Sequence, residues 1–194
     1  MRLTGGRFGG RQLATPSDER VRPTSDKVRQ AVFNILAHSD FGYGFTLDGA
    51  RVIYLIAGTG AMGLEALSRG ARYCLFVDNS AESRALVRQN VEALALTGAT
   101  KIWRRDATVL GQLSNNSGGP FDLAFLDPPY RRSLLLPALE SLRDGVWLAP
   151  AALLVAEYAI DEQLPRSPDF HTLDVRSYGD TAVEFLRVGS HDRS

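Results

Sequence analysis

The most specific chemical feature of the sequence is a rigid turn that offers hydrogen-bond acceptors around one carboxylate. Asp127 is followed by Pro128, Pro129 and Tyr130. Two successive prolines fix two φ angles and remove two amide donors, so carbonyl and carboxylate oxygens remain as acceptors. Such a turn can hold a planar exocyclic amine, on whose ring Tyr130 can stack, and orient the nitrogen lone pair toward a methyl donor. We therefore predict these four residues to be catalytic; the alternative is a stiff turn with a structural role only.

A glycine-rich turn earlier in the chain has the spacing of a nucleotide-cofactor site. Residues 58–63 have the order Gly-Thr-Gly-Ala-Met-Gly, between an apolar run and a predicted helix. Glycines there let the backbone turn tightly and approach a ligand, and the start of the helix presents free amide donors. The ending of a phosphate-binding loop is missing, which disfavours a nucleoside triphosphatase. Cofactors of several kinds, or a purely structural turn, are compatible with this motif.

Two further acids follow apolar runs. Asp78 comes at the end of the run after the glycine turn. A carboxylate in that place can accept both ribose hydroxyls of NAD or of S-adenosylmethionine. Asp106 ends the next predicted strand and could accept a hydrogen bond from an adenine amino group. The structural alternatives are an acid that caps the helix beginning near Ser80 and a solvated acid in a loop.

Alternating strands and helices would bring these residues to one edge of a sheet. Unbroken apolar runs are typical of parallel strands that are covered on both faces. Helices are predicted from the glycine turn to about Arg69 and over residues 81–95. The alternation predicts an open, mostly parallel α/β sheet with ligands at the carboxyl ends of its strands. The predicted strands are residues 52–56, 73–77, 101–105, 121–126 and 151–157, with two more within residues 175–188.

The start of the chain is organised differently from the rest. We predict a unit of residues 1–40 and a second unit of residues 41–194. In the first unit, glycines and alternating residues predict a short hairpin with basic faces over residues 3–13. Pro16 and Pro23 bracket an extended linker that follows it.

A helix is predicted after this linker. Thr24 or Ser25 can cap it, and Asp26 lies in the first turn, where the helix dipole favours an acid. Lys27 and Arg29 lie off the apolar stripe and are expected to face solvent or a ligand. The residues of that stripe have the spacing of one buried helix face: Val28, Ala31, Val32, Ile35 and Leu36.

Charge is distributed unevenly along the chain. The 194 residues carry 22 basic and 22 acidic side chains, a net charge of zero that at first argues against a nucleic-acid partner. Residues 1–29, however, contain seven bases and three acids and so carry a net charge of +4. Of the 22 bases 20 are arginines, whose donor fork suits phosphate and base recognition, although a general compositional bias would also explain the excess. The clustering predicts that the amino-terminal segment contacts RNA phosphates.

Several classes of protein are disfavoured by the composition. A single cysteine, Cys74, rules out an internal disulfide and fits a reducing compartment, so we expect a cytoplasmic protein. The first residues lack the apolar core of a signal peptide. The longest apolar stretch, residues 148–160, is too short and too polar to cross a bilayer, so no membrane contact is expected. The three histidines have no metal-ligand spacing, and no metal site is predicted.

Four stretches of the chain match the pattern of one family: residues 5–11 (GGRFGGR), residues 22–29 with 33–36 (RPTSDKVR, FNIL), residues 57–60 with 63–71 (AGTG, GLEALSRGA), and residues 127–130 (DPPY). Together they resemble the bacterial 16S rRNA guanine-N2 methyltransferases of the RsmD type over nearly the whole chain. The second and third stretches are specific to that family, whereas the proline pair is shared with amino-methyltransferases generally. The sequence departs from the family at Tyr54 and Ile56, where an aspartate that helps hold the methionine end of the cofactor and an aromatic residue are usual.

The resemblance implies a Rossmann-like class I methyltransferase fold, a mostly parallel seven-stranded sheet with helices on both faces. It implies S-adenosylmethionine as cofactor and methyl transfer to the exocyclic N2 amine of a guanine in 16S rRNA, on the small ribosomal subunit. The target base would have to leave its stack, and nothing calls for more than a monomer. Gly58 and Gly60 would approach the methionine part, Asp78 the ribose and Asp106 the adenine. The predicted cofactor-binding residues are Ala57, Gly58, Thr59, Gly60, Asp78, Asn79, Asp106 and Ala107, and the predicted RNA-binding residues are Arg7, Arg11, Arg22, Thr24, Lys27 and Arg29.

Three other functions are weighed against this one. A DNA adenine amino-methyltransferase uses a similar proline turn, but it needs a target-recognition region for which only residues 1–50 leave room. An NAD-dependent dehydrogenase would explain the glycine turn and leave the proline turn and the basic segment unexplained. A non-catalytic RNA-binding assembly factor would follow if Tyr54 had abolished cofactor binding.

Overall fold

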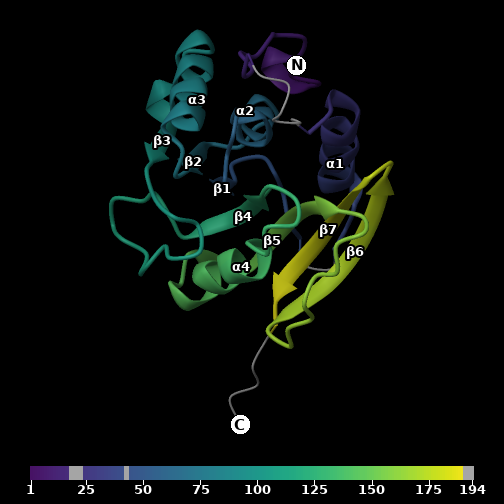
Figure 1. The fold of residues 1–194 in the computed structure, drawn as a ribbon. Helices are drawn as coiled ribbons and strands as arrows, with labels where there is room; N and C mark the ends of the chain where they lie inside the picture. Colours follow the sequence, from purple (N-terminus) through teal and green to yellow (C-terminus); the bar gives the residue numbers. More distant parts are fainter. Residues whose placement is uncertain (18–23, 42–43, 190–194) are drawn as a thin grey trace.

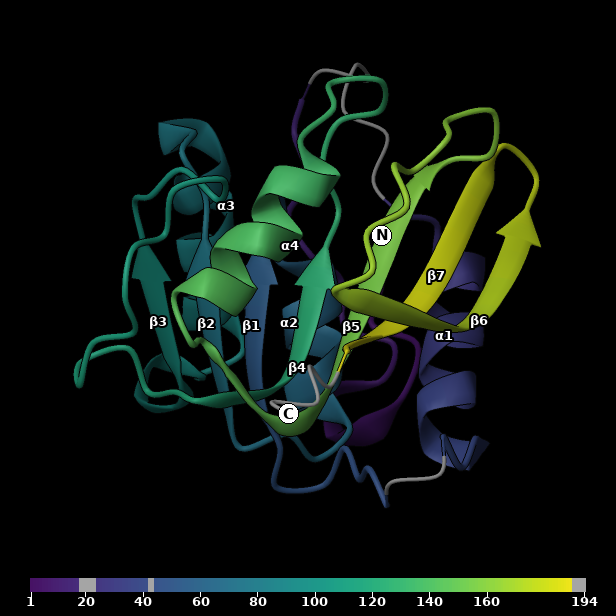
Figure 2. The same cartoon turned by 90° about the horizontal axis from the view of Figure 1, so that it is seen from below.

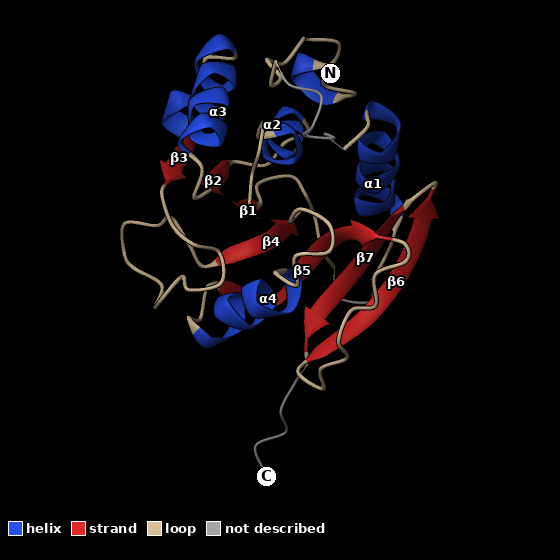
Figure 3. Cartoon of the chain, in the orientation of Figure 1, coloured by secondary structure: helices blue, strands red, loops and turns tan. Residues whose placement is uncertain are grey.

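A single seven-stranded sheet organises the computed structural model, which describes residues 1–17, 24–41 and 44–189. The strand order is β3-β2-β1-β4-β5-β7-β6 (Figures 1 and 3). The first five strands in that order run parallel, and β7 pairs antiparallel with both β5 and β6. The mostly parallel seven-stranded sheet is therefore confirmed. The strands are β1 (Arg51–Leu55), β2 (Tyr73–Val77), β3 (Thr100–Trp103), β4 (Phe121–Leu126), β5 (Leu148–Ala159), β6 (Phe170–Tyr178) and β7 (Thr181–Val188).

Helices cover both faces of the sheet, because alternate side chains of each strand point to opposite faces. Val52 and Tyr54 pack in one core with α1 (Asp26–His38), α2 (Ala61–Ser68) and α3 (Ala81–Ala93). Ile53 and Leu55 pack in a second core with α4 (Leu135–Asp144). Seen from below, α4 lies on the near face of the sheet and the other helices lie behind it (Figure 2). Both faces are thus buried, as the unbroken apolar strands predict.

The amino-terminal segment differs from the predicted hairpin. Only one antiparallel bridge, between Arg2 and Gln12, closes it within the described residues, and a short 3-10 helix (Gly6–Phe8) forms its tip. Gly6 (φ +72°) and Gly10 (φ +84°) adopt left-handed conformations that interrupt extended strands. The segment instead packs on α2, where Phe8 N donates to Ser68 Oγ (2.9 Å).

Helix α1 begins as predicted but buries a different face. Ser25 caps it, because its hydroxyl accepts a hydrogen bond from Val28 N (3.2 Å). Two members of the predicted stripe are buried, whereas Val28, Ala31 and Ile35 are only partly buried. The buried positions of the helix are Arg29, Val32, Phe33 and Leu36.

Other elements also depart from the prediction; strand β5, for example, extends beyond the predicted residues 151–157 at both ends. The third strand begins one residue earlier and ends at Trp103, two residues before the predicted end. Strand β6 begins at Phe170, ahead of the predicted residue 175. Helix α4 has no predicted counterpart; its Pro137 lies in the first turn, where proline is tolerated. No helix in the described part of the chain is long and apolar enough to cross a membrane.

Candidate active site

The carboxyl ends of four parallel strands place the predicted site residues in a line along one edge of the sheet. In the spatial order of the strands, Asp106 follows β3, Asp78 follows β2, residues 57–60 follow β1 and Asp127 follows β4. Successive strands run outward in one direction from β1 and in the other from β4, so the order reverses between these two strands. Open α/β sheets bind ligands at such a reversal. The glycine turn and the proline turn lie on its two sides.

The glycine turn has the backbone that its sequence predicts. Gly58 has φ +55° and Gly60 has φ +82°, in the left-handed region that favours glycine. A Cβ atom added to Gly58 would have no heavy atom within 4 Å, so this part of the turn borders open space. At Gly63 the reason is different: a Cβ atom would lie 2.5 Å from Phe76 Cε1, so only glycine lets α2 pack this closely on β2.

Asp78 connects the glycine turn to the start of α3. It is 8% exposed, its Oδ2 accepts from Gly58 N (3.0 Å), and its Oδ1 accepts from Ser80 N (2.8 Å). The helix cap itself is the Ser80 hydroxyl, which accepts from Ser83 N (3.3 Å). The carboxylate is thereby held beside the turn, with Asn79 exposed next to it.

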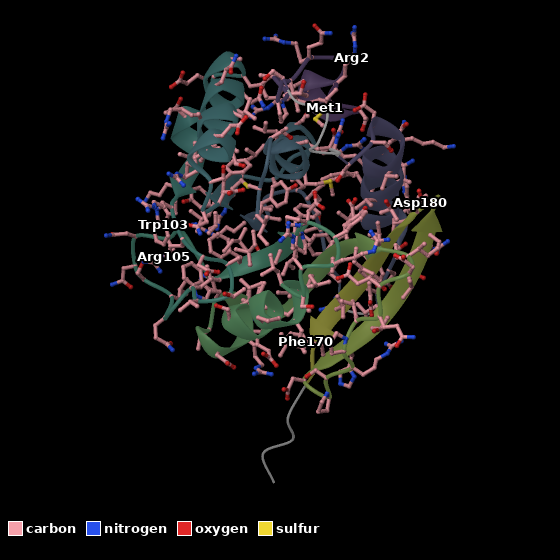
Figure 4. All side chains as sticks on the ribbon, viewed as in Figure 1. Met1, Arg2, Trp103, Arg105, Phe170 and Asp180 are labelled. Atoms are coloured by element: carbon pink, nitrogen blue, oxygen red, sulfur yellow. The ribbon has the colours of Figure 1, made fainter. Side chains whose placement is uncertain are left out.

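Asp106 lies in a more open environment. It is exposed, and its Oδ1 accepts from both Thr108 N (2.9 Å) and Thr108 Oγ1 (2.7 Å). These two hydrogen bonds lower the pKa of Asp106, so it is ionised at neutral pH. The neighbouring Arg105 guanidinium lies over the Trp103 ring, 4.8 Å from its centroid, at the end of β3 (Figure 4). Ala107 is buried behind them.

This side of the reversal fits an adenosine cofactor such as S-adenosylmethionine. The glycine turn borders open space at the start of α2, and the next two strands present one carboxylate each. Gly58 and Gly60 would approach the methionine part, Asp78 would accept from the ribose and Asp106 from the adenine amine. Ala57 and Thr59 are buried and support the turn from behind.

The other side contains two carboxylates that share one hydroxyl. Thr24 Oγ1 donates to Glu157 Oε2 (2.7 Å) and lies 3.3 Å from Asp127 Oδ2. Tyr54 OH lies 3.4 Å from the same Asp127 oxygen. Tyr130 OH donates to Glu157 Oε1 (3.1 Å) and lies 2.7 Å from Thr181 Oγ1. The carboxylate of Asp127 thus points inward to this hydroxyl network, although the residue as a whole is half-buried.

Strand register explains why the two carboxylates meet. Leu126 of β4 pairs with Ala156 of β5, so Asp127 and Glu157 come next on the two parallel strands and point to the same face. That face is the one covered by α1, whose preceding residues bring Thr24 over the pair. A cavity of about 10 Å³, roughly the size of one water molecule, is lined by both carboxyl-bearing residues and by apolar side chains.

Burial gives these groups unusual proton affinities. Burial and the nearby charge of Glu157 raise the pKa of Asp127 well above its ordinary value, and burial also raises the pKa of Glu157. Two desolvated carboxylates this close do not both ionise readily, and their titrations are linked. Burial raises the pKa of Tyr130 to about 12, and burial together with Asp127 raises the pKa of Tyr54, so both phenols stay protonated at neutral pH.

Two residues predicted to contact RNA are buried. Thr24 is 7% exposed and faces the carboxylate pair instead. Arg29, predicted to face solvent or a ligand, is wholly buried: its guanidinium donates to Glu65 Oε2 (3.0 Å), Asp26 Oδ1 (2.7 Å) and the carbonyl of Thr24 (3.3 Å). The expectation for Arg29 was wrong because Glu65, a buried anion on α2, needs a partner. Arg29 consequently holds Thr24 in place.

Arg7 and Arg11, two of the other predicted RNA contacts, lie away from the carboxyl edge. Arg7 belongs to the 3-10 helix that packs at Ser68, the last residue of α2, and the glycine turn is at the opposite end of that helix. Arg11 donates to the carbonyl of Ala93 (3.3 Å), where α3 ends. Lys27 is exposed on α1. Arg22 lies outside the described residues.

Sequence reasoning missed two residues of the site. Glu157 is half-buried in β5, and the only signal for it was a lone acid in an otherwise apolar run. Tyr54 was singled out as a departure from the family, but its hydrogen bond to Asp127 was not foreseen. Pro128 is buried and Pro129 exposed, so the proline pair lies at the rim of the site.

Strand order, a glycine turn after β1 and an acceptor turn after β4 define a Rossmann-like class I methyltransferase. The profile of the family described as Conserved hypothetical protein 95 matches residues 1–187, and the chain belongs to that family. The chain is 34% identical over 168 residues to ribosomal RNA small subunit methyltransferase D of Escherichia coli strain K12, covering 87% of this chain and 79% of that protein. It is 30% identical over 181 residues to the protein of the same name from Haemophilus influenzae, covering 92% and 89%. The resemblance drawn from the motifs is confirmed.

Solved structures share the fold. The yhhF protein of Escherichia coli matches with a TM-score of 0.80 and 27% identity, covering 98% of this chain and 99% of that one. A hypothetical protein of Thermus thermophilus, TTHA0928, matches with a TM-score of 0.72 and 26% identity, covering 97% and 99%. Both matches extend over the amino-terminal segment as well as the sheet.

Proposed function

We propose that this protein transfers a methyl group from S-adenosylmethionine to the exocyclic N2 amine of one guanine in the 16S rRNA of the small ribosomal subunit. The observation that carries the proposal is the inward-pointing Asp127 carboxylate in the double-proline turn, across the strand reversal from the glycine turn. Relatives that cover most of the chain are named ribosomal RNA small subunit methyltransferase D, which supports an rRNA substrate.

Asp127 supplies the chemistry that an aromatic amine needs. The carboxylate would accept one N–H of the amine and a carbonyl of the proline turn the other, which directs the nitrogen lone pair toward the glycine turn. When bound, S-adenosylmethionine supplies an electrophilic methyl group: the new C–N bond forms as the C–S bond breaks. The amine then loses one proton, and Asp127, whose pKa is raised by burial, is the acceptor within reach.

The Tyr130 ring is held in one orientation, in which it can stack on the flipped base. Its phenol is fixed by Glu157 and Thr181, which leaves the half-buried ring in one orientation next to the proline turn. Stacking of a base on an aromatic ring stabilises binding by about 1–3 kcal/mol, and it offsets part of the cost of unstacking the guanine.

The RNA-contacting surface extends away from the site. Arg7, Arg69 and Arg72 line an open groove of about 530 Å³ at the far end of α2, and Lys27 is exposed on α1. We propose that residues 1–40 form the RNA-contacting unit, with Arg69 and Arg72 adding to its surface, and that residues 41–194 form the methyltransferase unit. Contacts at both the groove and α1 would let the protein bind a folded RNA particle while one base enters the site. We further propose that it acts in the cytoplasm as a monomer.

The test is methyl transfer to small ribosomal subunits prepared from cells that lack the endogenous modification. The protein is incubated with these subunits and methyl-labelled S-adenosylmethionine, and the labelled nucleoside is then identified and mapped. The proposal predicts N2-methylguanine at one position of 16S rRNA. Label in adenine, label in DNA alone, or no label from a protein that binds the cofactor would contradict it.

A further inference from the structure

Glu157 fixes the Tyr130 phenol, but neither Glu157 nor Thr24 has a part so far in the proton transfer to Asp127, the proposed proton acceptor beside them. We propose that Glu157 is a positioning residue which, through the Thr24 hydroxyl, orients the Asp127 carboxylate and sets its affinity for the proton released by the amine. This inference rests on the proposed function, because it concerns the same site.

The Thr24 hydroxyl can donate its hydrogen to only one of the two carboxylates. Thr24 has one hydroxyl hydrogen, and the contact to Glu157 (2.7 Å) is shorter than the contact to Asp127 (3.3 Å). A hydroxyl group donates once and accepts through its lone pairs. With its hydrogen given to Glu157, Oγ1 can only accept from Asp127. A protonated Asp127 is therefore favoured, and an ionised Asp127 meets the lone pairs of Oγ1.

This direction fits the proton balance of methyl transfer. One proton leaves the amine as the C–N bond forms, and Asp127 takes it. The protonated Asp127 then donates to Thr24 Oγ1, and the Thr24 hydrogen already points to Glu157. Loss of this proton to solvent as the methylated base leaves restores the Asp127 carboxylate for the next turnover, so Glu157 and Thr24 keep the same protonation state throughout the cycle.

Few other charged or titratable groups face the pair from the elements packed around it. Tyr54 comes from β1 and Tyr130 from the proline turn, and both are neutral phenols at neutral pH. Arg29 of α1 reaches the carbonyl of Thr24, but its charge is balanced by Glu65 and Asp26. Asp78 lies across the turn and adds negative charge near Tyr54. The space behind the carboxylates is lined by apolar side chains of α1, α2 and β7: Val32, Met62 and Val183.

The decisive experiment is the pH dependence of methyl transfer by Glu157→Gln. Glutamine keeps the size and the oxygen acceptor for Thr24 but removes the charge. We expect the acidic limb of the rate profile to move to lower pH by about one unit, since removing a neighbouring like charge lowers a carboxyl pKa by this order. We also expect kcat to fall while the KM for the cofactor is unchanged.

The matched control is Glu184→Gln. Glu184 is a buried carboxylate on the adjacent strand β7 that accepts from Tyr158 OH (2.9 Å), and no described contact joins it to the pair. Its substitution should leave the profile in place. An unmoved profile in E157Q, or the same movement in E184Q, would overturn the inference. If E157Q does not fold, Thr24→Ser and Thr24→Val take its place. The serine variant keeps the hydroxyl and should keep the wild-type pH profile. The valine variant lacks the hydroxyl, and the acidic limb of its pH profile should move away from the wild-type position.

Failure of the inference and failure of the proposed function are distinguishable. A wild type that methylates 16S rRNA, with an E157Q profile identical to its own, overturns only the role of Glu157. If the wild type methylates nothing, NMR titration of the Asp127 carboxyl carbon in wild type and E157Q measures the coupling without turnover. Equal titration midpoints in that experiment would overturn the inference by themselves.

Discussion

Asp106 and Asp127 are the same residue type at the ends of strands in one sheet, yet their surroundings are opposite. Asp106 is exposed, and two hydrogen bonds from Thr108 lower its pKa. The carboxylate of Asp127 points into a desolvated network, where burial and Glu157 raise its pKa. The first is suited to remain an anion that accepts hydrogen bonds, and the second to exchange a proton. Under the proposed function, burial rather than residue type distinguishes the carboxylate that binds the cofactor from the carboxylate that accepts the proton of the amine.

The two sides also differ in how they are supported. On the side that we propose binds the cofactor (the glycine turn, Asp78 and Asp106; the cofactor side), backbone amides of the glycine turn and of Ser80 hold Asp78. On the side that we propose binds the target base (Asp127, Tyr130 and Glu157; the substrate side), side chains from two distant segments, Thr24 and Tyr54, hold Asp127, and the buried Arg29–Glu65 ion pair anchors the first of these segments. Substitutions on the substrate side should therefore affect both chemistry and stability, whereas those on the cofactor side should affect mainly binding.

The largest expected effect is that of Asp127→Ala on methyl transfer. Loss of the proton acceptor and amine ligand should lower kcat by about 10²–10⁴-fold, the usual contribution of a general acid–base group. Binding of S-adenosylhomocysteine, measured by calorimetry, should be unchanged, since Asp127 lies across the reversal from the glycine turn. Loss of cofactor binding in this variant would contradict the proposal that the cofactor and the target base bind on opposite sides of the strand reversal.

Arg29→Ala should be the most destabilising substitution of this set. It leaves Glu65 with a buried charge and removes the donor to the Thr24 carbonyl, so the free energy of unfolding in urea should fall by about 3–5 kcal/mol. The matched control is Arg69→Ala, which removes a more exposed partner of the same Glu65 and should cost much less. Equal losses in both variants would show that Arg29 has no special part in holding the substrate side.

Asp78→Ala should weaken cofactor binding more than it weakens folding. Removing a charged hydrogen-bond partner costs about 1.5–3 kcal/mol, which corresponds to a rise of about 10- to 150-fold in the dissociation constant of S-adenosylhomocysteine. At saturating cofactor, kcat should stay within a few-fold of wild type. A kcat loss as large as that of the Asp127 variant would mean that the acids on both sides act in the chemical step.

Asp127→Asn should stabilise the fold by a small, pH-dependent amount. A carboxyl whose pKa is raised by folding stabilises the native state at low pH and loses that contribution as the pH rises through the raised value. The variant should therefore match wild type in acid and exceed it at alkaline pH, by on the order of 1 kcal/mol for each unit of pKa shift. Urea unfolding across a pH series measures this; a wild type that gains stability over the variant with rising pH would contradict the raised pKa.

Local motifs predicted where the glycine turn and the acids after the apolar runs lie in the sheet. The glycine turn and the acids that end apolar runs are all set within a few residues of a strand, so a short stretch of sequence is enough to place them. The alternation of strands and helices likewise predicted the sheet, although α4 was missed: its buried Leu135, Ala138, Leu139 and Leu142 have the spacing of one helix face, but Pro137 made the segment resemble a loop.

The substrate side depends on contacts that no local pattern contains. Arg29 was expected at the surface because its partner Glu65 is 36 residues away and on another helix. Glu157 meets Asp127 only through the register of β4 and β5, which the sequence does not specify. Thr24 was grouped with the basic residues around it, and only the packing of α1 over the sheet shows that its hydroxyl faces the carboxylates.

The most direct measurement is a site-resolved NMR titration of the Asp106 and Asp127 carboxyl carbons in the same wild-type sample. The account predicts that Asp106 titrates below the ordinary value for aspartate and Asp127 well above it, with a midpoint that falls when Glu157 is replaced by glutamine. Titration of both carboxyls near the ordinary value would contradict the claim that burial assigns them different chemistry.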